Sequence, residues 1–194
     1  TFSLANIIPQ SPKANQENWR KIEEGVRTMV TKYRQPSYVI TGPLYLSKRV
    51  TKIGKGVLVP SHTYKVVFFP DRGVMSAYVT VNDNIAKTDV VSVAQLQEKS
   101  GIVFFPNLQG SKIISQRMKL PLSANAAYKA WDIPVINGQS QIFDVMPDPD
   151  ALPAVAKKGT QDSAKETAKA AAIQYVETKI SRSELANLKN DLEN

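Results

Sequence analysis

Two runs rich in β-branched and aromatic residues, at residues 63–69 and 75–81, are separated by the short sequence Pro-Asp-Arg-Gly at residues 70–73. These turn-forming residues favour a tight turn that reverses the chain. Two strands joined by so short a connection pair side by side and antiparallel. The sequence therefore predicts an antiparallel sheet, and the rest of the chain has to pack against it.

Residues 15–34 have the spacing of an amphipathic helix that ends near Gln35-Pro36. The apolar residues that recur three and four positions apart are Trp19, Ile22, Val26, Met29, Val30 and Tyr33. Further strands are predicted at 2–8, 38–41 (stopped by Gly42-Pro43), 57–59 and 102–105, and a short helix is predicted at 93–98. This order predicts an α+β fold with an antiparallel sheet.

The composition excludes several classes of protein. With 42% hydrophobic and 22% charged residues, the 194-residue sequence is typical of a globular protein and not of a disordered one. The absence of cysteine excludes disulfides, thiolate zinc sites and cysteine nucleophiles. No apolar run approaches the roughly 20 residues that a membrane helix needs, so we expect no membrane association.

Charge divides the chain into two parts. Residues 1–138 carry 18 Lys and Arg against 8 Asp and Glu, whereas residues 139–194 carry 7 against 9. The basic part, 1–138, is predicted to be the core domain and to attract a polyanion such as nucleic acid, with a merely solvated basic surface as the alternative. A linker is predicted at 139–162. Two capping boxes, at 163–166 and 181–184, predict a helical tail over 163–194.

Polar residues form a seam along one edge of the predicted 15–34 helix. On a wheel of about 100° per residue, Glu23 and Arg27 border the buried face, and Asn15 lies near them in the first turn. Asn6, at the end of the preceding predicted strand, is their neighbour. Amide and carboxylate oxygens suit hydrated Mg²⁺, and a guanidinium suits phosphate. The alternative is that Glu23 and Arg27 form an ordinary surface ion pair.

Several blocks of sequence share their order with one enzyme family. They are TFSLANIIPQ (1–10), NQENW (15–19) with Glu23 and Arg27, YVITGPLY (38–45), VPSHTYKV (59–66) and SGIVFFPN (100–107). Together they make residues 1–108 resemble the DNA/RNA non-specific endonucleases, the ββα-metal finger nucleases that include the endonuclease G-like enzymes. The resemblance implies a metal-dependent endonuclease that cuts DNA and RNA to 5′-phosphate ends.

The resemblance also implies a role for each residue of the seam. Asn15 matches the family's direct metal ligand, and Asn6 matches an asparagine near the scissile phosphate. Glu23 matches the acid that orients water at the metal, and Arg27 matches the arginine that stabilises the phosphate as it is attacked. The implied cofactor is Mg²⁺, with Mn²⁺ as an alternative.

One element of the family pattern is missing. The family's general base is the histidine of an Asp-Arg-Gly-His motif on a preceding strand, and this sequence does not contain that motif. The single histidine, His62, matches a strand position of the family, where we predict a structural role. Asp71-Arg72-Gly73 follows the wrong strand and ends in valine, so we interpret it as a turn. We therefore expect the base on an upstream segment or a second chain.

Other functions remain open at this point. A nuclease-like module without a base would bind nucleic acid or a protein inhibitor without cleaving it. An N-terminal threonine such as Thr1 can act as a nucleophile, although here it leads into the family's strand motif. We further expect an extracytoplasmic protein, secreted or periplasmic, with a mitochondrial location as the alternative. A homodimer formed through the tail is compatible with either main function.

Overall fold

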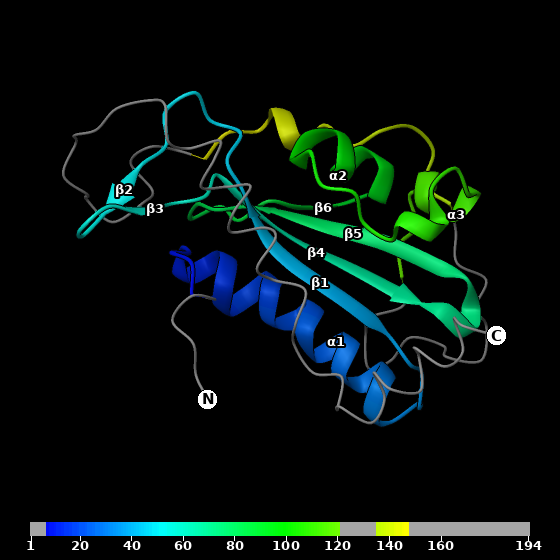
Figure 1. The fold of residues 1–194 in the computed structure, drawn as a ribbon. Helices are drawn as coiled ribbons and strands as arrows, with labels where there is room; N and C mark the ends of the chain where they lie inside the picture. Colours follow the sequence, from blue (N-terminus) through cyan, green and yellow to red (C-terminus); the bar gives the residue numbers. More distant parts are fainter. Residues whose placement is uncertain (1–6, 121–134, 148–194) are drawn as a thin grey trace.

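A four-stranded antiparallel sheet forms the centre of the fold (Figure 1). A computed structural model describes residues 7–120 and 135–147. The strand order is β1-β4-β5-β6, formed by β1 (Tyr38–Leu44), β4 (His62–Phe69), β5 (Val74–Val81) and β6 (Thr88–Val91). The α+β class and the antiparallel sheet predicted from the sequence are confirmed.

Short elements and helices connect and cover these strands. The helical elements are η2 (Ala14–Trp19), α1 (Arg20–Thr31), η3 (Pro70–Arg72), α2 (Val93–Ser100), η4 (Pro106–Leu108), α3 (Lys112–Ser115) and η5 (Ile142–Asp144). A separate two-stranded ribbon consists of β2 (Lys52–Ile53) and β3 (Val57–Leu58).

The sheet lies between two helical layers. Helix α1 covers one face, and α2 and α3 lie on the other (Figure 1). On the α1 face, Ile22, Val26 and Met29 pack with Val67 and Phe69 of β4 and with further apolar side chains. A second cluster fills the opposite face, where Leu96, Ile114 and Phe143 meet Val66 and Val79. Because both faces are covered, every residue of β5 is buried.

The N-terminal helix differs in detail from its prediction. It begins with a π-helical turn, η2, continues as α1 and ends at Thr31, three residues before the predicted end. Arg34 has a φ of 53°, a left-handed conformation that no α-helix continues through. The amide of Gln35 then donates to the carbonyl of Met29 at 3.1 Å, which turns the chain toward β1.

Two strand predictions were wrong, and one strand was missed. Strand β1 continues through Gly42 and Pro43, because it is an edge strand and proline is tolerated where no ladder bond is needed. Residues 102–105 form no strand. Side-chain amides bond their backbone instead, with Gln97 accepting from the amide of Phe104 and Gln109 donating to its carbonyl. The sheet's fourth strand is β6, which the sequence analysis missed.

Residues after 111 also belong to the core. Ile142 and Phe143 are 1% and 5% exposed, although the sequence analysis assigned residues 139–162 to a linker. The rest of that linker and the predicted helical tail at 163–194 lie outside the described residues. Of the strand predicted at 2–8, residues 2–6 also lie outside them, and residues 7 and 8 form no strand. Among the helices in the described part, none is long and apolar enough to cross a bilayer.

Candidate active site

Glu23 is held at the border between helix and sheet by an ion pair. Its Oε1 lies 3.5 Å from the Nζ of Lys65, which projects from β4 onto the α1 face. The Glu23 side chain is 47% exposed, whereas that of Lys65 is only 7% exposed. One end of the pair is therefore buried and the other faces water. The carboxylate has its second oxygen, Oε2, without a partner among the described residues.

Lys65 has three neighbours that together fix its ammonium group. Besides Glu23, it donates to Oγ1 of Thr41 at 2.9 Å and lies 4.8 Å from the centroid of the Trp19 ring. Thr41 stands opposite Lys65 in the β1–β4 ladder, and Trp19 closes the π turn. Burial lowers the pKa of Lys65, and the attraction and hydrogen bond of Glu23 oppose that shift. The Glu23–Lys65 pair has little conformational freedom because Lys65, the buried member, is held on several sides.

Asn15 lies on the exposed side of the π turn. Its backbone amide donates to the carbonyl of Ser11 at 3.1 Å, and its carboxamide makes no hydrogen bond to any described residue. A π turn advances less per residue than an α-helix, so a wheel of about 100° per residue misplaces Asn15 relative to Glu23. Such turns are frequent at functional sites.

Arg27 is exposed on α1, one turn after Glu23. The surface ion pair considered for these two residues is not formed; Glu23 pairs with Lys65 instead. The i,i+4 pair of this helix joins Arg20 and Glu24 instead, at 3.8 Å. The guanidinium of Arg27 forms no ion pair within the described residues, which leaves it available to an anion. Asn6 lies outside the described residues.

His62 is completely buried in β4 on the sheet face opposite α1, which fits the structural role predicted for it. Its Nδ1 lies 3.0 Å from Oγ of Ser61, and its Nε2 lies 3.2 Å from the carbonyl oxygen of Ile142. Burial lowers its pKa. Asp71 and Arg72 belong to the tight turn η3 between β4 and β5, as predicted.

The start of the helix is anchored by Asn82, which is fully buried after β5. Its Oδ1 accepts from the amide of Ser11 at 2.8 Å, and its Nδ2 donates to the carbonyls of Pro9 and Pro60 at 3.0 and 2.9 Å. Ser11 in turn accepts the bond from the amide of Asn15. The turn that carries Asn15 is thus fixed to the end of the sheet.

The sequence analysis missed Lys65 and Asn82. For Lys65 a signal existed, because a lone cation inside the apolar run of 63–69 needs a buried or bordering partner. Asn82 follows its strand in a polar stretch of ordinary composition. No local signal there could have indicated a residue that bonds segments more than 70 positions away.

The helical segment formed by η2 and α1 carries an exposed amide, carboxylate and guanidinium and covers one face of the antiparallel sheet. A family model described as DNA/RNA non-specific endonuclease matches residues 1–111. The chain belongs to this family, and the resemblance seen in the sequence is confirmed.

Similar proteins are nucleases by name. Human "Endonuclease G, mitochondrial" is 32% identical over 126 residues, which cover 56% of this chain and 42% of that protein. Xenopus laevis "Nuclease EXOG, mitochondrial" is 35% identical over 132 residues, 58% of this chain and 37% of that protein. The chain thus spans about two fifths of the length of these relatives. No solved structure matches it significantly.

Proposed function

We propose that the protein is a divalent-metal-dependent endonuclease that hydrolyses phosphodiester bonds in both DNA and RNA. Family membership supports the nuclease class. The observation that carries the proposal is the Glu23–Lys65 pair, because a carboxylate is held at a solvent-facing edge on the helix that also bears Asn15 and Arg27.

The side chains present fit a hydrated divalent cation. Mg²⁺ keeps several waters and takes few protein oxygens. Asn15 offers an amide oxygen that no described residue engages, and Glu23 offers Oε2 to the surrounding water. Within the described residues no three His, Asp or Glu side chains cluster as a metal cage. We assign Asn15 as the direct ligand of Mg²⁺, or alternatively Mn²⁺.

Each residue then has a distinct task. Bound at Asn15, the cation would neutralise charge on the phosphate and assist the departing 3′ oxygen. Glu23, kept in place by Lys65, orients water beside the phosphate. Arg27 offers its guanidinium to the phosphoryl oxygens, and its charge matters more as negative charge grows during attack. Asn6 contacts the phosphate from the preceding segment.

The proton acceptor is proposed to lie outside this sequence. His62 is an unsuitable base, because it is fully buried and both ring nitrogens lie against Ser61 and Ile142. No second histidine exists in the sequence. The relatives are more than twice as long as the part that matches, which leaves room for an Asp-Arg-Gly-His segment in the same protein or on a companion chain.

The names of the relatives bear on where such a protein works. Those proteins are named as mitochondrial, which supports the mitochondrial alternative and gives no support to a secreted or periplasmic location. The competing function is a module that binds nucleic acid without cutting it. It would keep the affinity of the basic surface but would have no use for a metal at Asn15.

The test compares the full protein with the variant Asn15→Ala on plasmid DNA and on RNA, with Mg²⁺ and with chelator. We expect cleavage of both substrates, dependence on the metal, and a loss of about 100-fold or more in the variant. Gln16→Ala, an exposed neighbour on the same turn, is the matched control and should keep full activity.

Two results would overturn the proposal. Full activity in Asn15→Ala would remove the metal assignment, and binding without any cleavage by the parent protein would establish the non-cutting module. Peptide mapping of the active preparation identifies the base. We expect a peptide with Asp-Arg-Gly-His, whereas full activity from a preparation without it would require another base.

A further inference from the structure

A hairpin outside the candidate active site carries a group of positively charged residues. Residues 48–58, here called the basic hairpin, include β2 and β3 and carry Lys48, Arg49, Lys52 and Lys55. No acidic residue occurs anywhere between positions 25 and 70. The positive charge of this hairpin is therefore not neutralised by its neighbours in sequence.

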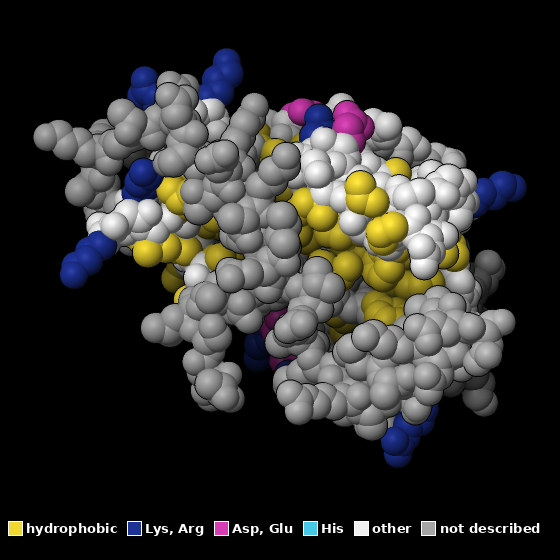
Figure 2. Space-filling model, in the orientation of Figure 1, with side chains coloured by type: hydrophobic (Ala, Val, Ile, Leu, Met, Phe, Trp, Pro, Cys, Tyr) yellow, Lys and Arg dark blue, Asp and Glu magenta, His cyan; other side chains and the backbone are white. Residues whose placement is uncertain are grey.

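The cations of the basic hairpin face outward. Lys48, Arg49 and Lys55 are exposed, and within the described residues none of them takes part in an ion pair or a hydrogen bond. Figure 2 shows Lys and Arg side chains projecting from the end of the molecule where Figure 1 places β2 and β3. These three exposed cations, with the partly exposed Lys52 between them in sequence, form a positive arm at one end of the fold.

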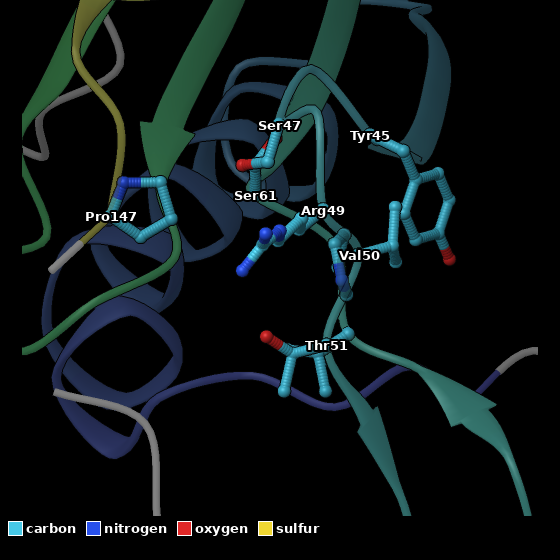
Figure 3. A pocket seen from close by; sticks show the side chains of 9 residues that line it. Tyr45, Ser47, Arg49, Val50, Thr51, Ser61 and Pro147 are labelled. Atoms are coloured by element: carbon cyan, nitrogen blue, oxygen red, sulfur yellow. The ribbon is translucent and has the colours of Figure 1, made fainter. Parts of the chain in front are cut away.

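A small hollow lies at the base of this arm. It is lined by Tyr45, Ser47, Arg49, Thr51 and Ser61, among others (Figure 3). The guanidinium of Arg49 extends into the space between Ser47 and Thr51 (Figure 3). The hydroxyl of Ser61 is already bonded to the backbone of Leu44 and Leu46. The guanidinium of Arg49 and the hydroxyl of Thr51 are groups that can donate to phosphate oxygens. The base of the arm therefore offers groups that suit phosphate in addition to the lysines of the hairpin.

The arm is firmly attached to the sheet. The amide of Val59 donates to the carbonyl of Thr51 at 2.8 Å, which closes the ribbon. At its root, Ser61 bonds the backbone on the incoming side, where its Oγ accepts from the amide of Leu46 at 2.9 Å and its amide donates to Leu44. The hairpin is therefore a fixed projection with a defined direction.

The same attachment links the arm to the turn that carries Asn15. Asn82 bonds Pro60, just after the basic hairpin, and it also bonds Pro9 and Ser11, just before η2. In Figure 1 the ribbon of β2 and β3 extends past the N-terminal end of the helix. A nucleic acid strand that reached Asn15 would continue toward this arm.

We infer that the basic hairpin binds the phosphate backbone of nucleic acid beside the site of cleavage, an inference that rests on the proposed function. Lys and Arg contacts to phosphates add affinity but carry no information about sequence. The arm therefore acts as a second anchor that holds substrate across the helix. An anionic membrane surface would attract the same cations, but the bonded link to the Asn15 turn favours nucleic acid.

The experiment measures how salt weakens binding of the full protein to unrelated DNA duplexes, by fluorescence anisotropy with chelator present to prevent cleavage. The hairpin variant combines Lys48→Gln, Arg49→Gln and Lys55→Gln. The control variant combines Lys99→Gln, Lys112→Gln and Lys119→Gln, which removes equal charge from exposed positions of α2, α3 and the segment after it. Each phosphate contact contributes about 0.9 to the slope of log affinity against log salt.

We expect the slope to become shallower by about 2–3 in the hairpin variant, on every duplex, and to change by less than about 1 in the control. Equal losses in the two variants would reduce the effect to net charge and overturn the inference, as would an unchanged hairpin variant. Binding of both variants to vesicles that contain phosphatidylserine is measured in addition. If the hairpin variant lost vesicle binding but kept DNA binding, the partner would be a membrane.

A single-site measurement adds the position of contact. Because the sequence has no cysteine, Lys55→Cys and Lys112→Cys each give one site for a photo-crosslinker. Cross-linking to DNA is expected from position 55 and not from 112, and the reverse result would overturn the inference. If the parent protein binds DNA through the hairpin but cuts nothing, the proposed nuclease activity is refuted and the inference about the hairpin stands. If the parent protein cuts DNA and the hairpin contributes nothing to binding, only the inference about the hairpin is refuted.

Discussion

Lys65 brings a positive charge to the interface between sheet and helix, where burial makes an unpaired charge costly. The cost is offset by Glu23, Thr41 and the Trp19 ring, each contributed by a different element. Because Glu23 is half exposed, water screens the pair and its direct contribution to stability is modest. Its value lies in fixing one orientation of a carboxylate that otherwise rotates freely.

Replacing this lysine tests that role. In Lys65→Met the carboxylate of Glu23 loses its fixed partner. We expect the turnover of the proposed cleavage reaction to fall by about 10–100-fold, the usual cost of removing a group that orients a catalytic or metal-binding side chain. The Michaelis constant should change little. Steady-state kinetics of the full protein on plasmid DNA gives both quantities.

A double variant separates positioning from stability. If Lys65 acts through Glu23, then Lys65→Met adds almost nothing to the loss already caused by Glu23→Gln. Fully multiplicative losses in Lys65→Met/Glu23→Gln would mean that Lys65 acts by another route. Circular dichroism of all variants verifies that each is folded.

At the scale of elements, Asn82 joins the segment before η2 to the end of the β4–β5 ladder, where the basic hairpin meets the sheet. Its side chain bonds Ser11 ahead of η2 and Pro60 behind the basic hairpin, and its own backbone amide donates to the carbonyl of Ser61 at 2.9 Å. Buried backbone groups need such partners, since water cannot reach them. One carboxamide therefore sets how helix, hairpin and sheet meet.

Truncating this carboxamide is expected to be costly. In Asn82→Ala the amide of Ser11 and the carbonyls of Pro9 and Pro60 lose their partner, and we expect roughly 1–3 kcal/mol less unfolding free energy for the loss of buried hydrogen bonds. The exposed neighbour variant Asn84→Ala should stay within about 0.5 kcal/mol of the parent. Urea titration measures both, and equal stability of the two variants would contradict the role assigned to Asn82.

Some elements of the fold could be predicted from the sequence, and others could not. The helix, β4, β5 and their turn were predicted because each has a strong local period or turn signal. Strand β6 was missed because it begins with the polar residues Thr88 and Asp89 and its apolar part is short. Residues 102–105 were wrongly predicted as a strand because the side chains of Gln97 and Gln109, and no neighbouring strand, form hydrogen bonds with the backbone there. Within the candidate site, Glu23 was placed at the edge of the buried face correctly, but its partner came from a distant strand.

At the scale of the whole molecule, the fold extends beyond the part that matches the family. The match ends at residue 111, yet Ile114, Met118 and Ile142 are buried in the two core clusters. Polar bonds secure the same segment. Nη2 of Arg117 donates to both carboxylate oxygens of Asp89 in β6, each at 2.8 Å, and Gln95 donates to the carbonyl of Ser140 at 2.7 Å. The segment around 142 is therefore part of the folded unit.

His62 couples that unit to pH. Its ring lies between Ser61 and the carbonyl of Ile142, so it links β4 to η5, and burial lowers its pKa below the ordinary value of about 6.5. As pH falls below about 6.5 the unfolded chain takes up a proton that the folded chain resists. Unfolding free energy therefore decreases on acidification, by at most about 1.4 kcal/mol per pH unit for one group.

We expect the stability of the full protein to be flat above about pH 7 and to fall between about pH 6.5 and 5. Carboxylates titrate at lower pH than this window. For Asp89, burial acts to raise the pKa, but hydrogen bonds from Ser140, Val90 and Arg117 outweigh that effect and lower the pKa. Since His62 is the single histidine of the sequence, His62→Gln should remove the decrease in this window. Urea unfolding at pH 7.5, 6.5 and 5.5 measures it for parent and variant. If both lose stability equally, the proton is taken up elsewhere and the coupling assigned to His62 is wrong.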